Sequence, residues 1–302
     1  MKILIAGSSG LIGSALIPVL KAQGHQVVRL VRRKADAEEG VASWNPAAGQ
    51  LDPNAFEGVN AVVNLAGESI AAARWTSERK ARLRDSRVQG TKLLSETLAR
   101  LANPPEVLVS ASAVGYYGSR GDEVMSEEKP PGAGFLPEVC VAWEAATEPA
   151  RQRGIRVINL RIGMVLSGEG GALQPMASAF RMGVGGKLGD GRQFMGWITN
   201  DDLTRAILHV IVNTSFHGPV NAVAPNPVPN KEFTESLGKV LRRPAVFSMP
   251  AFVVRLAFGE MADALLLASA RVEPARLLAG GFTFQYPELE GALRHVLGKS
   301  QG

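Results

Sequence analysis

Three glycines near the N-terminus have the spacing of a phosphate-binding turn. Gly7, Gly10 and Gly13 stand in the segment GSSGLIG, directly after the apolar run Lys2–Ala6 and before the helical pattern of residues 11–20. Such glycines permit a tight turn, let a pyrophosphate approach amides at the helix N-terminus, and let the helix pack closely on the strand. This order of elements predicts that the turn contacts a dinucleotide through Gly7, Ser9, Gly10, Leu11, Ile12 and Gly13.

The end of the next predicted strand, residues 26–31, indicates which dinucleotide binds. A fold that prefers NAD usually places Asp or Glu there, which holds the ribose 2′-hydroxyl. This chain has Arg32 and Arg33, followed by Lys34. A guanidinium can bind a 2′-phosphate through two parallel hydrogen bonds. We therefore predict NADP(H) as the cofactor, with Arg32 and Arg33 on its 2′-phosphate, whereas Lys34 is as readily a solvated basic residue.

Further cofactor contacts are predicted after three later elements. Leu65, Ala66 and Gly67 end the apolar run of residues 60–65, and their small side chains let the backbone approach a ribose. Arg82 and Arg87 lie on the polar helix predicted for residues 77–100 and are candidates for phosphate contacts. Surface ion pairs are the alternative for both, and Arg87 is the stronger candidate. Met164, just past the predicted strand of residues 155–162, is expected to border the nicotinamide.

Composition excludes several classes of protein. The chain has 302 residues, of which 46% are hydrophobic, and its net charge of +5 is dispersed over 33 basic and 28 acidic residues. Such dispersion argues against a nucleic-acid partner. The single Cys140 and four scattered histidines provide no metal site and no internal disulfide. Because no run approaches 18 apolar residues, we expect no membrane span. We also predict a cytoplasmic protein whose substrate is small and polar.

Strand and helix patterns alternate regularly as far as residue 162. Such alternation predicts an α/β fold with a doubly wound parallel sheet of the Rossmann type. After Gly163 the chain becomes rich in glycine loops, and PNPVP at residues 225–229 precedes a helical tail. We therefore predict a dinucleotide-binding domain at residues 1–222 and a smaller, mostly helical, substrate-side lobe at residues 223–302. Residues 164–200 are expected to contribute partly to that lobe.

Several motifs together resemble a known family. GSSGLIG, NLAG, SASAVGYYG and NLRIGMVL resemble the extended short-chain dehydrogenase/reductases, which are NAD(P)-dependent epimerases, dehydratases and reductases acting largely on nucleotide sugars. RWTSERKARLRDSRVQGT, WITNDDL and the tail from RPAVFSMPAF to QYPEL resemble a narrower atypical group. That group is called the "epimerase family" (YfcH-like or SulA-like) and has a distinctive C-terminal helical domain. The resemblance extends over essentially the whole chain.

The catalytic positions depart from the pattern that this resemblance implies. The family places a Tyr, and a Lys four residues later, on the helix after strand 106–111, where Lys lowers the Tyr pKa for proton transfer. Residues 135–144 contain neither residue, and Arg87 stands where the active-site Asn is expected. Ser112 matches the family serine. Tyr116 and Tyr117 lie earlier and are candidates for a displaced acid, with Ser112 on a carbonyl.

Structural alternatives exist for each of these residues. The YYG segment is often a packed strand end, and Ser112 can cap its own turn. Glu68 is another candidate acid or base, or else it pairs with Arg74 or Lys80. Phe194 and Trp197 either wall a substrate pocket or belong to the core.

Two functions follow. One is an NADP(H)-dependent oxidoreductase or nucleotide-sugar-epimerase-like enzyme of unknown substrate, which the glycine loops and Trp197–Ile198 favour. The other is a non-catalytic NADP(H)-binding regulator, comparable to the division-related role suggested for SulA-like relatives. The missing Tyr and Lys favour the second function. The sequence leaves the substrate, the direction of the reaction and the oligomeric state open.

Overall fold

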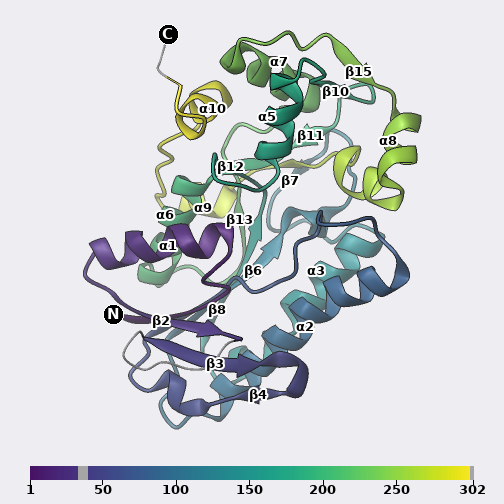
Figure 1. Cartoon of the computed structure of the whole chain (residues 1–302). Helices are drawn as coiled ribbons and strands as arrows, with labels where there is room; N and C mark the ends of the chain where they lie inside the picture. Colours follow the sequence, from purple (N-terminus) through teal and green to yellow (C-terminus); the bar gives the residue numbers. More distant parts are fainter. Residues whose placement is uncertain (33–39, 300–302) are drawn as a thin grey trace. The chain divides into compact units, whose positions relative to one another are not determined.

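The largest sheet of the fold has eight strands, and most of them are labelled in Figure 1. The structure is a computed structural model and describes residues 1–32 and 40–299. The strand order is β13-β8-β6-β5-β1-β2-β3-β4, and β1 pairs in parallel with β2 and β5, as β5 does with β6 and β2 with β3. The strands are β1 Lys2–Ala6, β2 Gln26–Val31, β3 Val41–Asn45, β4 Gln50–Leu51, β5 Ala61–Asn64, β6 Val107–Ala113, β8 Arg156–Ile162 and β13 Gly218–Ala222. This topology confirms the predicted Rossmann-type sheet.

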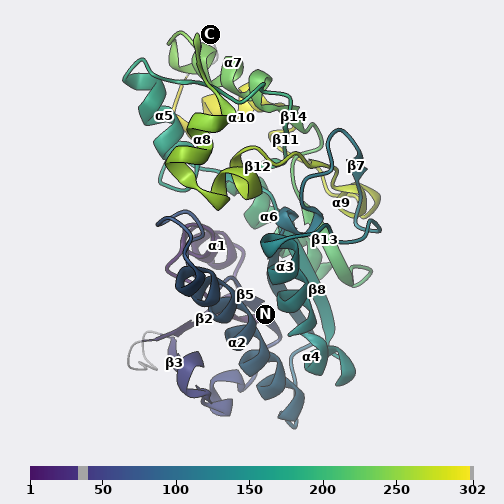
Figure 2. The ribbon, with the colours of Figure 1, turned by 90° about the vertical axis from the view of Figure 1, so that its right-hand side faces the viewer.

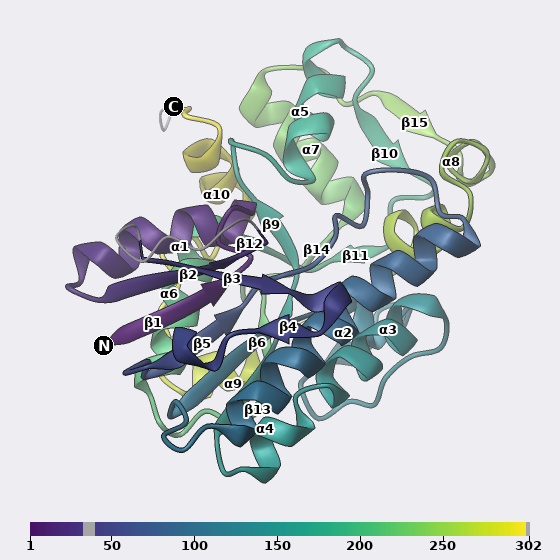
Figure 3. The ribbon, with the colours of Figure 1, turned by 60° about the horizontal axis from the view of Figure 1, so that its bottom comes forward.

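Helices cover both faces of the sheet. Helices α1 (Leu11–Ala22) and α6 (Asn200–Val212) lie on one face, and α2 (Ser77–Arg100), α3 (Phe135–Ala145) and α4 (Glu148–Gln152) lie on the other (Figure 3). The sequence of residues 136–153 reads as helical throughout, but the structure divides it into two helices, since α3 ends at Ala145 and α4 begins at Glu148. Pro149 has no N–H to donate to the carbonyl of residue 145, so α3 cannot continue through it.

The register of the sheet places leucine and valine side chains in one buried row. Leu4 is the partner of Val62, and Val62 is the partner of Leu108 on the next strand. All three are fully buried, and they share a core cluster with Leu94 and Leu98, one turn apart on α2. A shift of one residue in any strand would turn its apolar side chain to the opposite face. This row therefore fixes which strand ends lie beside one another.

The chain forms two compact units that interleave along the sequence. The first comprises residues 1–112, 139–160 and 204–220, and the second comprises residues 113–138, 161–203 and 221–302. The division into two consecutive domains, at residues 1–222 and 223–302, stays a prediction. No helix within residues 1–32 and 40–299 is long and apolar enough to cross a membrane.

The second unit combines helices with short strands. Helices α5 (Leu173–Arg181), α7 (Asn230–Leu241) and α10 (Leu289–Val296) belong to this unit (Figure 2). They pack around a core that includes Trp197 and Phe233. Its remaining elements are α8 Ala251–Phe258, α9 Ala275–Ala279 and the short strands β7 Val124–Met125, β9 Met164–Leu166, β10 Gly186–Leu188, β11 Phe194–Met195, β12 Trp197–Thr199, β14 Val228–Pro229, β15 Phe247–Met249 and β16 Arg271–Val272. Short helical turns lie in this unit at η3 Val114–Tyr117 and η4 Ala262–Leu266, and in the first unit at η1 Pro46–Ala48 and η2 Pro53–Phe56.

A buried aspartate at the start of α6 holds the C-terminal segment. Helix α6 begins at Asn200, within the segment WITNDDL. Asp202 is fully buried, and its carboxylate accepts hydrogen bonds from the backbone N–H groups of Gln285, at 2.8 Å, and Tyr286, at 2.9 Å. Asp201 beside it is exposed and pairs with His295 at 3.1 Å. The two neighbouring carboxylates therefore have different roles.

Replacing each aspartate in turn separates these roles. We expect Asp202→Ala to lower the free energy of unfolding by about 2–4 kcal/mol, because two backbone N–H groups lose their acceptor. Asp201→Ala, the matched control, should change it by less than about 0.5 kcal/mol, as for most exposed ion pairs. Urea unfolding measures both values, and similar losses from the two variants would contradict this role of Asp202.

Candidate functional site

The glycine turn between β1 and α1 is shaped by its own backbone. Gly7 has a φ of +79°, and a Cβ there would lie 2.6 Å from the carbonyl carbon of Leu65. A Cβ on Gly13 would lie 2.4 Å from the carbonyl oxygen of Gly7. Because both collisions involve backbone atoms, only glycine fits at these two positions. The turn and the end of β5 are therefore in direct contact.

Gly10 differs from the other two glycines. A Cβ on Gly10 would approach only the carbonyl oxygen of Gly7, at 3.4 Å, which packing tolerates. Gly10 is the N-cap of α1, and no side chain of the described residues caps it. Ser9 and Gly10 are exposed, and Leu11 and Ile12 are half-buried. A helix N-terminus that begins behind a glycine, where no described side chain forms a cap, fits an anionic pyrophosphate, because the amides and the helix dipole both favour negative charge.

The basic end of β2 lies beside this turn. Ala6, the last residue of β1, is the register partner of Leu30, so exposed Arg32 follows two residues beyond that point. Arg33 and Lys34 lie outside the described residues. Arg29, which sequence analysis did not single out, directs its Nε to the hydroxyl of Ser8 at 3.4 Å. The strand end therefore brings an exposed guanidinium to the side of the turn where a 2′-phosphate is expected.

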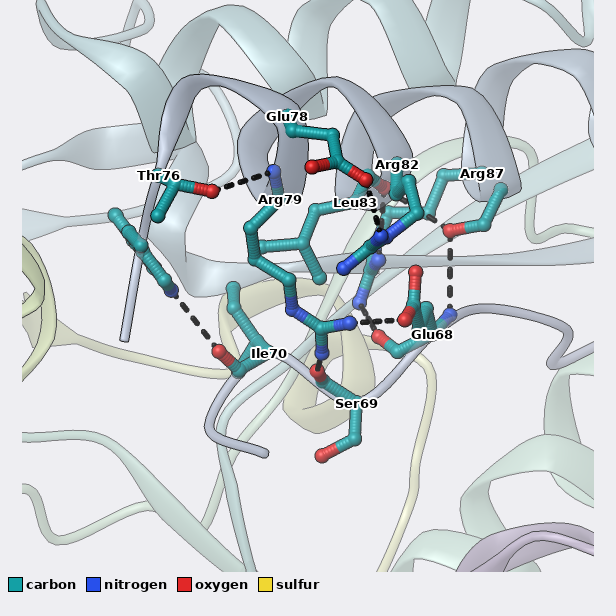
Figure 4. A network of polar contacts seen from close by, with 11 residues as sticks. Glu68, Ser69, Ile70, Thr76, Glu78, Arg79, Arg82, Leu83 and Arg87 are labelled. Carbon is teal, nitrogen blue, oxygen red and sulfur yellow. Dashed lines mark hydrogen bonds and ion pairs between the residues drawn. The ribbon is translucent and has the colours of Figure 1, made fainter. Parts of the chain in front are cut away.

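Arg87 holds the loop after β5 rather than presenting its charge to solvent. Leu65 and Ala66 are half-buried and Gly67 is exposed. The Arg87 guanidinium donates to the carbonyl oxygens of Leu83 and Glu68, both at 2.9 Å (Figure 4). It also lies 5.2 Å from the centre of the Trp143 ring. Burial lowers the pKa of Arg87, which the nearby Cys140 and Glu68 side chains partly oppose.

A second arginine, Arg79, ties the same loop from one end of α2. The Arg79 guanidinium forms an ion pair with the Glu68 carboxylate and donates to the carbonyl oxygen of Ser69 at 2.5 Å (Figure 4). Its side chain is 8% exposed. Glu68, the candidate acid or base, is therefore engaged by Arg79. Sequence analysis missed Arg79, although its spacing of four from buried Leu83 places both on one face of α2.

Arg82 lies on a different face of α2. Its guanidinium forms an ion pair with Glu78, one turn earlier, at 2.7 Å, and its side chain is 54% exposed. This arrangement is the surface ion pair that was the alternative to a phosphate contact. Cofactor contacts by Arg82 and Arg87 stay predictions.

Ser112, at the end of β6, hydrogen-bonds to a residue that sequence analysis did not consider. Its hydroxyl donates to the Glu144 carboxylate at 2.7 Å, and Ser112 is only 3% exposed. Glu144 lies in the last turn of α3 and is half-buried. In sequence the two residues are 32 apart, so no local pattern could indicate the pair.

The two candidate tyrosines belong to the second unit. Tyr117 is fully buried; its hydroxyl donates to the Asn221 side chain at 2.7 Å and accepts from Arg161 at 3.0 Å. Burial raises the pKa of Tyr117, and the Arg161 charge only partly opposes this effect. The Tyr116 ring lies under the same guanidinium, 3.4 Å from ring centre to Cζ. These contacts favour the packed alternative, and proton transfer by either tyrosine stays a prediction.

Met164, the residue predicted beside the nicotinamide, also lies in the second unit. In β9 it pairs with Trp197 of β12, and its N–H donates to the carbonyl oxygen of Gly196 at 2.8 Å. Trp197 is fully buried and donates from its indole to the carbonyl oxygen of Asn226, so it belongs to the core. Phe194 is half-buried, with the Arg271 guanidinium 5.3 Å from its ring centre.

Arg79 and Arg82 lie on the same helix but make different contacts, so replacing each in turn tests whether Arg79 stabilises the loop. We expect Arg79→Met to lower the free energy of unfolding by about 2 kcal/mol, because Glu68 and the Ser69 carbonyl lose a shared charged donor. Arg82→Met should lower it by no more than about 0.5 kcal/mol, as for an exposed i,i+4 pair. Denaturant unfolding of both variants is the measurement. If Arg82→Met costs as much as Arg79→Met, the loop does not depend on Arg79.

Comparison with known proteins agrees with the geometry of the first unit. Residues 3–222 match the NAD dependent epimerase/dehydratase family, and residues 249–296 match a domain of unknown function, DUF1731. The epimerase family protein Mb2239 of Mycobacterium bovis is 46% identical over 294 residues, which are 97% of each chain. The human epimerase family protein SDR39U1 is 36% identical over 302 residues, covering 98% of this chain and 100% of the human protein.

Solved structures are similar over the same range. Human SDR39U1 (isoform 2), crystallised with NADPH, has a TM-score of 0.89 and 32% identity over 99% of both chains. A nucleoside-diphosphate sugar epimerase from Corynebacterium glutamicum has a TM-score of 0.83 and 38% identity, covering 99% of this chain and 58% of that one. The resemblance inferred from the motifs is thereby confirmed. The chain belongs to the NAD dependent epimerase/dehydratase family, in the atypical short-chain dehydrogenase/reductase group that includes SDR39U1.

Proposed function

We propose that the protein binds NADP(H) and uses it in an oxidoreductase or epimerase-like reaction on a small polar substrate. The observation that carries the proposal is the glycine turn before α1, whose Gly10 has no cap from a described side chain, with exposed Arg32 at the end of the neighbouring strand. Human SDR39U1, which covers the same length, was crystallised with NADPH. When bound, NADP(H) supplies or accepts a hydride.

Specific residues would hold each part of the cofactor. The backbone from Ser9 to Ile12 would bind the pyrophosphate at the positive end of α1, and the Leu65–Gly67 turn would lie against a ribose. Arg32 would bind the 2′-phosphate, together with Arg33. Arg87 would act on the ribose indirectly, because it holds the loop that would lie against the ribose. Met164 would contact the nicotinamide through its backbone.

A regulator that binds NADP(H) without turnover is the second candidate. It is favoured by the composition of α3, which contains neither Tyr nor Lys, and by the buried, fully engaged Tyr117 hydroxyl. For either function we place the protein in the cytoplasm, where the lone Cys140 stays reduced, with a small molecule rather than nucleic acid as its partner.

Charge reversal at Arg32 tests the preference for NADP(H). We expect NADPH to raise the melting temperature more than NADH at equal concentration, and a ligand at 100 times its Kd stabilises by about 2.7 kcal/mol. Arg32→Asp should weaken NADPH binding by roughly 10- to 100-fold, because a charge-assisted hydrogen bond is worth about 1.5–3 kcal/mol.

NADH affinity provides the internal control, because NADH has no 2′-phosphate and Arg32→Asp should leave its Kd nearly unchanged. Lys21→Asp makes the same charge reversal on an exposed residue at the far end of α1, and both affinities should then stay constant. Equal losses of NADPH and NADH affinity in Arg32→Asp would refute the contact with the 2′-phosphate.

A further inference from the structure

The hydrogen bond between Ser112 and Glu144 lies at the edge of the sheet where the cofactor turn is found. Strand β6 is parallel and adjacent to β5, and β5 to β1, so the ends of these three strands share one edge. Gly7 follows β1, Leu65–Gly67 follow β5, and Ser112 lies at the end of β6. Ligands of open α/β sheets bind outside this edge.

Helix α3 is the helix on which the family carries Tyr and Lys. Within the first unit, few side chains of α3 could transfer a proton in their place. The Trp143 indole N–H is buried and donates to the Thr91 hydroxyl at 2.9 Å. Cys140 is a buried thiol. Glu144 is the α3 side chain that combines a carboxylate with a hydrogen bond to Ser112.

We propose that Ser112 and Glu144 form the proton-transfer pair of this protein, in place of the family's Tyr and Lys. The inference rests on the proposed NADP(H)-dependent reaction and names the residues that move its proton. In the structure the Ser112 hydroxyl donates to the carboxylate, so the lone pairs of Ser112 Oγ are left to accept a hydrogen bond. This is the state that receives a proton from a substrate hydroxyl.

Proton and electrons balance as follows when an alcohol is oxidised. The substrate O–H proton moves to Ser112 Oγ while the Ser112 proton moves to the Glu144 carboxylate, which becomes a carboxylic acid. The substrate C–H bond breaks with loss of a hydride, whose two electrons are taken up by NADP⁺, and the C–O bond becomes C=O. In reduction, Glu144 returns its proton through Ser112 to the carbonyl oxygen.

Burial of the pair suits this role. Ser112 is 3% exposed, so little water competes for its hydroxyl, and residues 113–116 after it are half-buried. Glu144 is also half-buried and can exchange its proton with solvent between turnovers. Ser112 is the catalytic residue of the pair, since it touches the substrate oxygen, and Glu144 acts through it as a positioning and proton-holding residue.

The test follows NADPH consumption by the full chain with three probe carbonyls, diacetyl, glyceraldehyde and phenanthrenequinone. Glu144→Gln and Ser112→Ala should each lower kcat by about 100-fold or more, the usual contribution of general acid–base catalysis, with little change in the Kd of NADPH. Glu148→Gln, on the neighbouring helix α4, is the matched control and should keep the wild-type rate; Glu148 pairs with Arg151 at the surface.

Two readouts distinguish proton transfer from a merely structural hydrogen bond. Added formate should restore part of the lost rate in Glu144→Ala, because it replaces the carboxylate, but not in Ser112→Ala. The second readout is the melting temperature, which needs no turnover. The double variant Ser112→Ala/Glu144→Gln should melt at about the temperature of the less stable single variant, because the two side chains stabilise each other.

Each remaining outcome contradicts a defined part of the inference. If the wild-type chain consumes NADPH and Glu144→Gln does so at a rate within twofold of the wild-type rate, the proposed pair is wrong. The oxidoreductase function would then still stand. Additive losses of melting temperature would show that the two side chains do not interact. NADPH binding without consumption of any probe carbonyl would overturn the oxidoreductase function, and the pair would fall with it.

Discussion

The close approach of two backbone segments fixes the arrangement of the strand ends in the first unit. The turn after β1 lies so near the end of β5 that a methyl group on Gly7 would collide with the Leu65 carbonyl group. Both partners are backbone atoms, so no change of side-chain rotamer can relieve the contact. Because β1 and β5 are thus fixed at their ends, Arg32 at the end of β2 and Ser112 at the end of β6 take defined positions on either side of the turn.

Positive charge in this region is directed at the protein backbone as well as at the expected phosphates. Arg79, Leu83 and Arg87 recur every four residues, which is one face of α2, and both guanidiniums donate to carbonyl oxygens of the loop after β5. A planar guanidinium can satisfy two carbonyls in fixed directions, whereas an ammonium group lacks that geometry. The loop after β5 is therefore held in shape by side chains of the protein itself.

Features set by local sequence could be predicted, and features set by distant partners could not. The glycine turn and the helix of residues 77–100 follow from spacing and from the Thr76 cap, and the structure has both. Pro149 is also a local signal, because a proline at this position separates α3 from α4. By contrast, Glu144 meets Ser112 across 32 residues, and the Tyr117 hydroxyl meets Asn221 across 104, so only the folded chain reveals these partners.

The departures from the family pattern are linked through charge. A Tyr–Lys pair uses a cation to favour the deprotonated phenol, so the base is an anion held by a neighbouring positive charge. In a Ser–Glu pair the carboxylate is itself the base, and no cation is needed to create it. Loss of the Lys removes one positive charge from this edge of the sheet, and Arg87 at the expected Asn position restores one. These departures are consistent with a base that carries its own charge in place of a base that depends on a cation.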